Sequence, residues 1–281
     1  MSKGILLASG CSYTDPNFKS LDPDVKTFQW PMWPQHVGKS LSLEVINSGL
    51  SGNDNLSIHN NIVRDLSKYG NRVKCVCILW SGFDRFRFMH TSTLQLLHQM
   101  GRGVIPEFMA HLNDPKNMVT ETGVREWLKA LATSDYWNPK NLIMGSILDS
   151  ITYMVSIAEV CETKGIPYIF YQGVQPVNWI LLNHIQETIG KPLVKKDEVL
   201  KEFIAEPSFR LFQKYKKNIV GFPLFPTLDG ECFDHLRWNN TGGTSDMSMK
   251  VSALDFHPNG EGQEKLAEIF LEKYYKVYGR P

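Results

Sequence analysis

Five short apolar runs are spread along the chain, and longer segments with helical periodicity separate them. Each run is bounded by Gly, Pro or Ser, which is typical of buried parallel strands. The runs cover residues 4–8, 43–47, 73–80, 167–172 and, more weakly, 219–224. Strands that alternate with helices predict an α/β fold with helices on both faces of a mostly parallel, five-stranded sheet. We therefore expect a three-layer α/β/α sandwich.

Three of the intervening segments have the periodicity of amphipathic helices. They cover residues 53–69, 142–164 and 258–278. Gly70 and Gly165 directly follow the first two segments, and glycine commonly ends a helix. Pro258 suits the first turn of the third helix, where the backbone N–H has no intrahelical partner. The pattern thus predicts three helices that flank the sheet.

We interpret the 281 residues as a single domain. Two stretches, residues 83–141 and 173–217, are longer than the connections of a minimal α/β unit and are rich in aromatic residues, Pro and Asn. We expect both to be insertions that form the walls of a cleft. No internal repeat, low-complexity tract or linker separates them from the rest of the sequence.

Charge and composition exclude several classes of protein. The 30 Lys and Arg residues nearly balance the 29 Asp and Glu residues, so a net charge of +1 provides no field for nucleic acid or an anionic membrane. No apolar run approaches the roughly 20 residues of a membrane span, and the N-terminal run is too short for a secretion signal. We expect a cytoplasmic protein, although a protein of a virion would show the same pattern.

The cysteines and histidines predict neither a disulfide framework nor a metal site. The 5 cysteines are an odd number without framework spacing. Cys75 and Cys77 have no histidine nearby to complete a zinc site. The sequence also lacks the phosphate-binding loop, the dinucleotide fingerprint and the H-E-x-x-H zinc motif. We expect a protein without a cofactor.

Residues with catalytic potential follow the first two apolar runs and precede the last helix. Ligands of parallel sheets bind beyond the carboxyl ends of the strands, so these positions lie at the binding edge. Ser12 follows the first run, where its hydroxyl can be exposed at a tight turn or can cap the next segment. Gly52 follows the second run, where it either lets the backbone approach a ligand or makes a plain turn. His257, with Asp255 beside it, can act as a base or cap the last helix.

Together these segments resemble the SGNH (GDSL-like) hydrolase family. The resemblance rests on Gly10-Cys11-Ser12 after the first run, Gly52 after the second, and Asp255-x-His257-Pro258 before the last helix. It implies a flavodoxin-like sandwich with Ser12 as nucleophile, His257 as base and Asp255 as acid. It also implies backbone oxyanion donors at Ser12 and Gly52. The G-C-S-Y-T start and the W-S-x-x-x-R segment are similar to divergent members, including those encoded by tailed phages.

Two departures from the family pattern concern the nucleophile and the acid. Cys11 replaces the family's Asp, either as a buried inert thiol or as a competing nucleophile. The spacing between Asp255 and His257 is one residue shorter than in the family. A backbone carbonyl, Asp246 or Asp234 could orient the histidine instead.

A third departure follows the third apolar run, where the sequence reads Trp80-Ser81-Gly82-Phe83-Asp84-Arg85. Asp84 takes the place of the family's Asn, and a carboxylate would repel a developing oxyanion. Asn53 or Asn55 would then supply the donor, or the site would have backbone donors only. Ser81 and Arg85 are further candidates for the substrate site. Arg85 would pair with Asp84 or meet an anionic substrate group.

The resemblance implies a serine esterase that cleaves a small acyl ester, such as an O-acetyl group on a carbohydrate. One or two of the seven tryptophans could stack on a sugar near the cleft. Acyl transfer to a sugar hydroxyl is a second reaction open to such a site. Because both the acid and the oxyanion donor depart from the pattern, the alternative is a catalytically degenerate module that binds glycan or serves as a structural or assembly protein.

Overall fold

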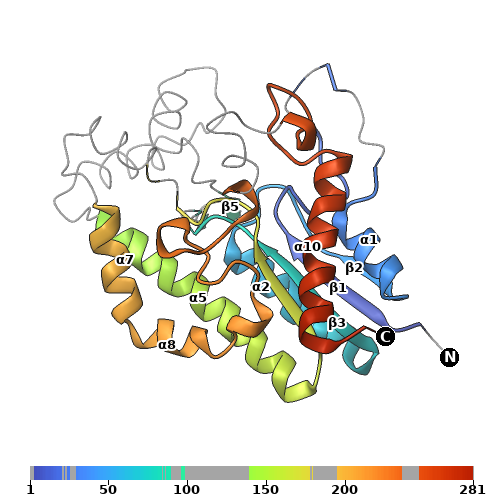
Figure 1. Cartoon of the computed structure of the whole chain (residues 1–281), viewed down its shortest axis with the longest axis horizontal. Helices are drawn as coiled ribbons and strands as arrows, with labels where there is room; N and C mark the ends of the chain where they lie inside the picture. Colours follow the sequence, from blue (N-terminus) through green and yellow to red (C-terminus); the bar gives the residue numbers. More distant parts are fainter. Residues whose placement is uncertain are drawn as a thin grey trace.

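The computed structural model describes residues 3–20, 22, 24–25, 30–83, 85, 87–89, 96–98, 139–177, 179, 195–235 and 247–280. At its centre lies a four-stranded sheet with the strand order β2-β1-β3-β6, in which every pair is parallel (Figure 1). The strands are β1 (Ile5–Gly10), β2 (Glu44–Asn47), β3 (Val73–Trp80) and β6 (Tyr168–Gln172). The carboxyl ends of all four strands therefore meet at one edge.

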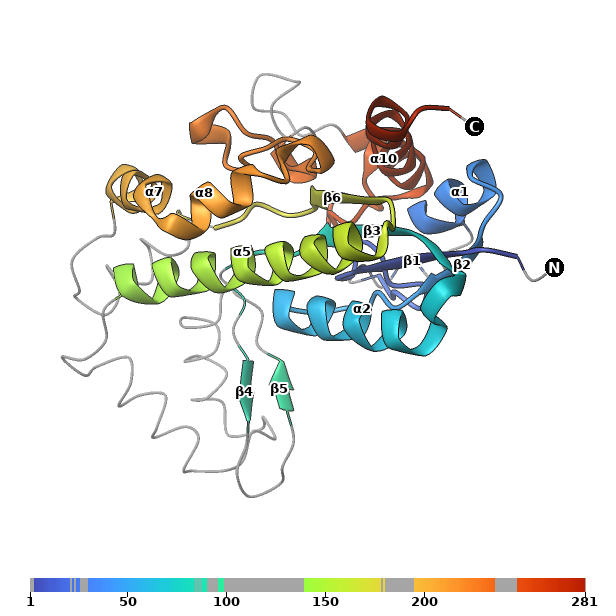
Figure 2. The same ribbon diagram turned by 90° about the horizontal axis from the view of Figure 1, so that it is seen from below.

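Helices cover both faces of the sheet, as Figure 2 shows, so the predicted three-layer α/β fold is confirmed. Helices α1 and α10 pack on one face and α2 and α5 on the other, while α7 and α8 pack against α5. The helices are α1 (Trp33–Ser40), α2 (Asn55–Tyr69), α5 (Pro139–Lys164), α7 (Lys196–Ala205), α8 (Pro207–Gln213) and α10 (Gly260–Tyr278). Two short strands, β4 (Arg87–Met89) and β5 (Leu96–His98), pair antiparallel.

The sheet divides the apolar core into two parts, because successive side chains of a strand point to opposite faces. Leu7 packs into the part under α2 and α5, whereas its neighbours Leu6 and Ala8 pack into the part under α1 and α10. On β3, Ile78 and Cys77 divide in the same way. Burial on both faces explains why these strands are continuous apolar runs in the sequence.

The predicted fifth strand, residues 219–224, is wrong. Within the described residues this segment makes one isolated parallel bridge, between Ile219 and Phe170 on β6. Gly221 then has a φ of +65°, and Pro223 follows in a turn. A left-handed backbone and a residue without an N–H end the extended pairing after one bridge.

Helix α5 begins at Pro139, three residues before the sequence pattern suggests. It also corrects the expectation that no apolar stretch of the chain approaches the length of a membrane span. Over Ile143–Lys164 it is long and apolar enough to pass a length and composition test for a membrane span, and 44% of the tested window is buried. Its buried residues include Ile147 and Ile151, which pack in the part of the core that α2 also covers. The apolar stretch therefore contributes to the core between the sheet, α2 and α8.

The described residues cover the two expected insertions only in part. Of residues 83–141, the structure describes 83, 85, 87–89, 96–98 and 139–141. Of residues 173–217, it describes 173–177, 179 and 195–217, which include α7 and α8. The remaining residues lie outside the described part, and the expected role of both insertions as cleft walls stays a prediction.

Candidate active site

Ser12 lies in a tight turn directly after β1, at the carboxyl edge of the sheet. The turn is closed by a 2.9 Å hydrogen bond from the Thr14 amide to the Cys11 carbonyl. The indole N–H of Trp33, in α1, donates to the Thr14 hydroxyl at 3.1 Å and anchors the turn against the helix layer. Cys11 is fully buried in the core, whereas Ser12 keeps 7% of its surface exposed. The turn thus presents the hydroxyl and hides the thiol.

His257 meets this hydroxyl from the other end of the chain. It lies in the segment that leads into α10, and its Nε2 is 2.8 Å from Ser12 Oγ. The Tyr13 ring stands edge-on to the imidazole with centroids 5.4 Å apart. The Phe18 ring covers it at a centroid distance of 4.1 Å. Two aromatic rings from the segment after β1 therefore restrict where the imidazole can move.

The carboxylate of Asp255 contacts the other ring nitrogen of His257, Nδ1. Its Oδ1 lies 2.5 Å from Nδ1 and also accepts the His257 backbone N–H at 3.1 Å. The backbone turn that carries Asp255 is held by Ser252, whose hydroxyl accepts the Asp255 N–H at 3.1 Å. A carboxylate two residues before a histidine thus reaches its ring by folding back over the histidine's own amide.

Asp255 is completely buried, yet its environment favours the charged form. Burial alone raises the pKa of such a carboxyl group. Hydrogen bonds from the His257 ring, the Ser20 hydroxyl and the His257 amide outweigh burial and hold the pKa of Asp255 below its usual range. A charged Asp255 fixes the hydrogen of His257 on Nδ1, which leaves the lone pair of Nε2 directed at Ser12.

The two other acids considered for His257 lie elsewhere. The Asp234 carboxylate accepts the Tyr13 hydroxyl at 2.8 Å and the Gln175 amide at 3.3 Å. It thereby joins the segment after β6 to the residue next to Ser12. Asp246 lies outside the described residues. Of the acids that the structure describes, Asp255 is the one bonded to the His257 ring.

Gly52 lies in the loop after β2, which packs against the Ser12 turn. Its φ of +84° is a backbone conformation that favours glycine. Asp15 joins the two loops, because its carboxylate accepts the Ser51 amide at 2.8 Å and the Ser51 hydroxyl at 2.7 Å. Within the described part of the chain, neither the Ser12 amide nor the Gly52 amide donates a hydrogen bond. Both amides are therefore candidate donors to a ligand.

The other residues named for oxyanion or substrate binding have structural partners. The Asn53 side chain donates to the Gly10 carbonyl at 3.1 Å, and Arg85 donates to the Asn53 carbonyl at 3.0 Å. The amide nitrogen of Asn55 donates to the Ser81 carbonyl and the Ser150 hydroxyl, which uses both of its hydrogens. Its oxygen accepts the Ser81 N–H at 2.9 Å.

The expectations for these residues change accordingly. Asn55 has no hydrogen left for an oxyanion, and fully buried Ser81 is held by Asn55 through its backbone. Arg85 meets a backbone carbonyl, while Asp84 lies outside the described residues, so a pair between them stays a prediction. The described residues hold no group of three His, Cys, Asp or Glu side chains that could bind a metal ion.

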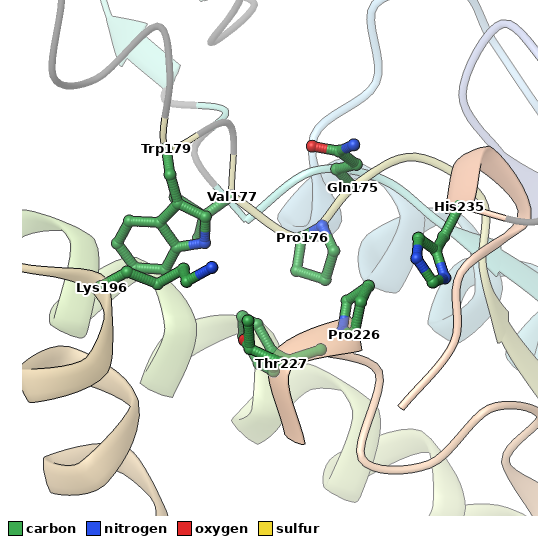
Figure 3. A pocket seen from close by; sticks show the side chains of 9 residues that line it. Gln175, Pro176, Val177, Trp179, Lys196, Pro226, Thr227 and His235 are labelled. Atoms are coloured by element: carbon green, nitrogen blue, oxygen red, sulfur yellow. The ribbon is translucent and has the colours of Figure 1, made fainter. Parts of the chain in front are cut away.

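A pocket of about 170 Å³ lies beyond the carboxyl end of β6. Figure 3 shows Trp179 and Lys196 on one side of it and Pro176, Pro226 and His235 on the other. Lys196 is the first residue of α7, and Trp179 belongs to the segment after β6. Asp234 links the pocket wall to the Ser12 turn by hydrogen bonds, because its carboxylate accepts both the Gln175 amide, in the pocket wall, and the hydroxyl of Tyr13, the residue after Ser12.

No motif or periodic pattern points to three further residues that shape the site, namely Asp15, Phe18 and Ser20. Ser20 donates to Asp255 at 2.5 Å, and Phe18 covers His257. All three belong to the segment after Ser12, where the residues follow no periodic pattern. The signal that could have found them is their closeness in sequence to the nucleophile candidate.

Comparisons with known proteins give similarity at the level of the fold. No protein-family model matches the sequence, and no curated protein matches it. The similar solved structures include SGNH- and GDSL-like hydrolases at low sequence identity.

Three examples show the extent of this similarity. A GDSL-like lipase from Bacteroides thetaiotaomicron VPI-5482 is 12% identical, with a TM-score of 0.40 over 97% of this chain and 88% of that chain. An acetyl xylan esterase is 11% identical, with a TM-score of 0.41 over 95% and 98%. A protein provisionally described as an SGNH hydrolase, from Slackia heliotrinireducens, is 12% identical, with a TM-score of 0.39 over 97% and 99%. At these values the likeness says nothing about side chains, and the site rests on the distances given above.

Proposed function

We propose that the chain is a serine esterase in which Ser12 is the nucleophile, His257 the general base and Asp255 the acid that orients the base. The observation that carries the proposal is a continuous line of hydrogen bonds. The Ser12 hydroxyl is 2.8 Å from Nε2 of His257, and Asp255 is 2.5 Å from Nδ1. A hydroxyl within hydrogen-bond reach of an imidazole whose other nitrogen is held by a carboxylate has the arrangement of an activated nucleophile.

The chemistry proceeds in two halves. Ser12 Oγ attacks the ester carbonyl carbon while its proton passes to Nε2 of His257. The tetrahedral oxyanion accepts hydrogen bonds from the Ser12 and Gly52 amides, neither of which donates to another group within the described residues. His257 then gives the proton to the departing alcohol, leaving an acyl group on Ser12. Water attacks this acyl group in the second half, again with His257 as base, and releases the acid and free Ser12.

The adjoining pocket supports a carbohydrate as the alcohol part of the ester. Trp179 offers an aromatic face on which a sugar ring can stack. Lys196, Thr227 and His235 line the same pocket and can hydrogen-bond to sugar hydroxyls. A small acyl group, such as acetyl, would then lie at Ser12 while the sugar occupies the pocket beside it.

Turnover of p-nitrophenyl acetate by the purified chain and by Ser12→Ala tests the proposal. We expect hydrolysis by the wild type and a loss of at least 10³-fold in the variant, since the nucleophile is gone. Ser67→Ala, on the exposed face of α2, is a matched control and should retain full activity. Equal turnover by the wild type and Ser12→Ala would reject Ser12 as nucleophile. Release of acetate without added sugar, compared with acetyl transfer in its presence, separates hydrolysis from acyl transfer.

A further inference from the structure

We propose that Ser20 is a positioning residue that clamps the Asp255 carboxylate in the orientation that His257 needs. This inference deepens the proposed function and rests on it. Ser20 lies eight residues after Ser12, in the same segment that follows β1. One segment would thus carry the nucleophile and also hold the acid that orients the base.

The hydroxyl of Ser20 is itself directed toward Asp255. Its Oγ lies 2.5 Å from Asp255 Oδ2. The Asp22 N–H donates to the same Oγ at 3.0 Å and so occupies one of its lone pairs. Because a hydroxyl has a single hydrogen and a carboxylate can only accept, the hydrogen of Ser20 must lie between Oγ and Oδ2.

The contacts between Asp255 and His257 involve one of the two carboxylate oxygens. Both contacts from His257, from its ring and from its amide, fall on the same carboxylate oxygen, Oδ1. A turn of the carboxylate about its Cβ–Cγ bond moves both oxygens together and weakens both of these contacts. The Ser20 bond to Oδ2 adds a contact on the second oxygen, so that a turn of the carboxylate plane must weaken bonds on both oxygens. The plane matters because Nδ1–H must meet a lone pair of Oδ1 at a good angle.

The same segment also restricts the imidazole. Phe18, two residues before Ser20, covers the His257 ring at a centroid distance of 4.1 Å. Asp255 is fully buried, and a buried carboxylate that loses a donor either turns to find another or weakens its hold on its partner. Removal of the Ser20 hydroxyl should therefore affect Ser12 through the Asp255–His257 and His257–Ser12 hydrogen bonds. Ser20 itself needs no contact with the substrate.

Three variants test this role. Ser20→Ala removes the hydroxyl, Ser20→Thr retains it, and Lys19→Ala changes the exposed neighbour in the same segment. For Ser20→Ala we expect kcat for p-nitrophenyl acetate to fall about 10-fold with little change in KM, by analogy with the partners that orient metal-ligating histidines. Ser20→Thr should recover most of the loss, and Lys19→Ala should match the wild type.

The ring nitrogen chemical shifts of His257 provide a readout that does not depend on activity. In ¹⁵N-labelled protein near neutral pH, the wild type should show the tautomer protonated on Nδ1, and Ser20→Ala should show a mixture of tautomers. If the wild type proves inactive but this shift difference is present, the proposed function fails and the positioning role stands. If the shifts and kcat are the same in wild type and Ser20→Ala, the positioning role is wrong whatever the activity.

Discussion

The carboxylate of Asp255 lies 2.5 Å from Nδ1 of His257, although a single residue separates them in the chain. Asp255→Asn keeps the shape of the side chain but can present an N–H to the ring in place of an acceptor. The histidine would then carry its hydrogen on Nε2, where it cannot accept the proton of Ser12. We expect kcat for p-nitrophenyl acetate to fall on the order of 10³–10⁴-fold. A fall of less than 10-fold would show that another group orients His257.

The carboxylate of Asp255 should make the free energy of unfolding depend on pH in the acid range. Hydrogen bonds hold the pKa of Asp255 below its usual range, so the folded chain takes up this proton only at lower pH than the unfolded chain does. Its contribution to stability is complete above about pH 4, the usual value for an unfolded Asp, and is lost as the pH falls further toward the folded pKa. Urea unfolding of wild type and Asp255→Asn should give a difference in unfolding free energy that narrows below about pH 4. A difference that stays constant down to pH 2 would contradict this account.

Much of the fold could be predicted because its signal is local. Strand β3 has the predicted bounds, and β1 and β6 differ by one or two residues, since burial on both faces makes each a continuous apolar run. The segment 219–224 has similar composition, but Gly221 and Pro223 limit it to one bridge. Composition alone does not separate a strand from an apolar turn.

The site could be predicted only where topology requires it. Parallel strands bring their carboxyl ends to one edge, and this is why Ser12 and the segment before α10 were expected to meet. The bonds from Asp15 to Ser51 and from Ser20 to Asp255 depend on single side chains in loops, which no periodic pattern describes. The roles of Ser12, Gly52 and His257 in catalysis remain predictions for experiment.

Asn55 should matter to stability because it joins the start of α2 to the end of β3. Its side chain accepts the Ser81 N–H and donates to the Ser81 carbonyl and the Ser150 hydroxyl, all in buried surroundings. Asn55→Ala leaves these groups without that partner, and we expect a loss of about 3 kcal/mol in unfolding free energy by urea titration. Asn60→Ala, at an exposed position of the same helix, is the control and should change it by less than about 0.5 kcal/mol. Equal losses in both variants would be inconsistent with the role given to Asn55.

Trp179 should affect carbohydrate esters more than small aryl esters. Its ring lines the pocket beyond the carboxyl end of β6, where we place the sugar. Trp179→Ala should raise KM for an acetylated oligosaccharide about 3- to 10-fold, the size of one lost aromatic contact. The kinetics with p-nitrophenyl acetate should stay as in the wild type, and Trp179→Phe should recover part of the loss. Equal effects on both substrates would mean that Trp179 supports the fold and does not bind sugar.

Reaction of Ser12 with a fluorophosphonate probe tests the central claim most directly, because it requires an activated hydroxyl but no knowledge of the substrate. Ser12 Oγ would form a bond to phosphorus, fluoride would leave, and His257 would take the proton. Mass spectrometry of the digested protein should find one phosphonylated residue, Ser12, in the wild type. The adduct should be absent from Ser12→Ala and should form at least 100-fold more slowly in His257→Ala. An unlabelled wild type, or labelling that is unchanged in His257→Ala, would contradict the account.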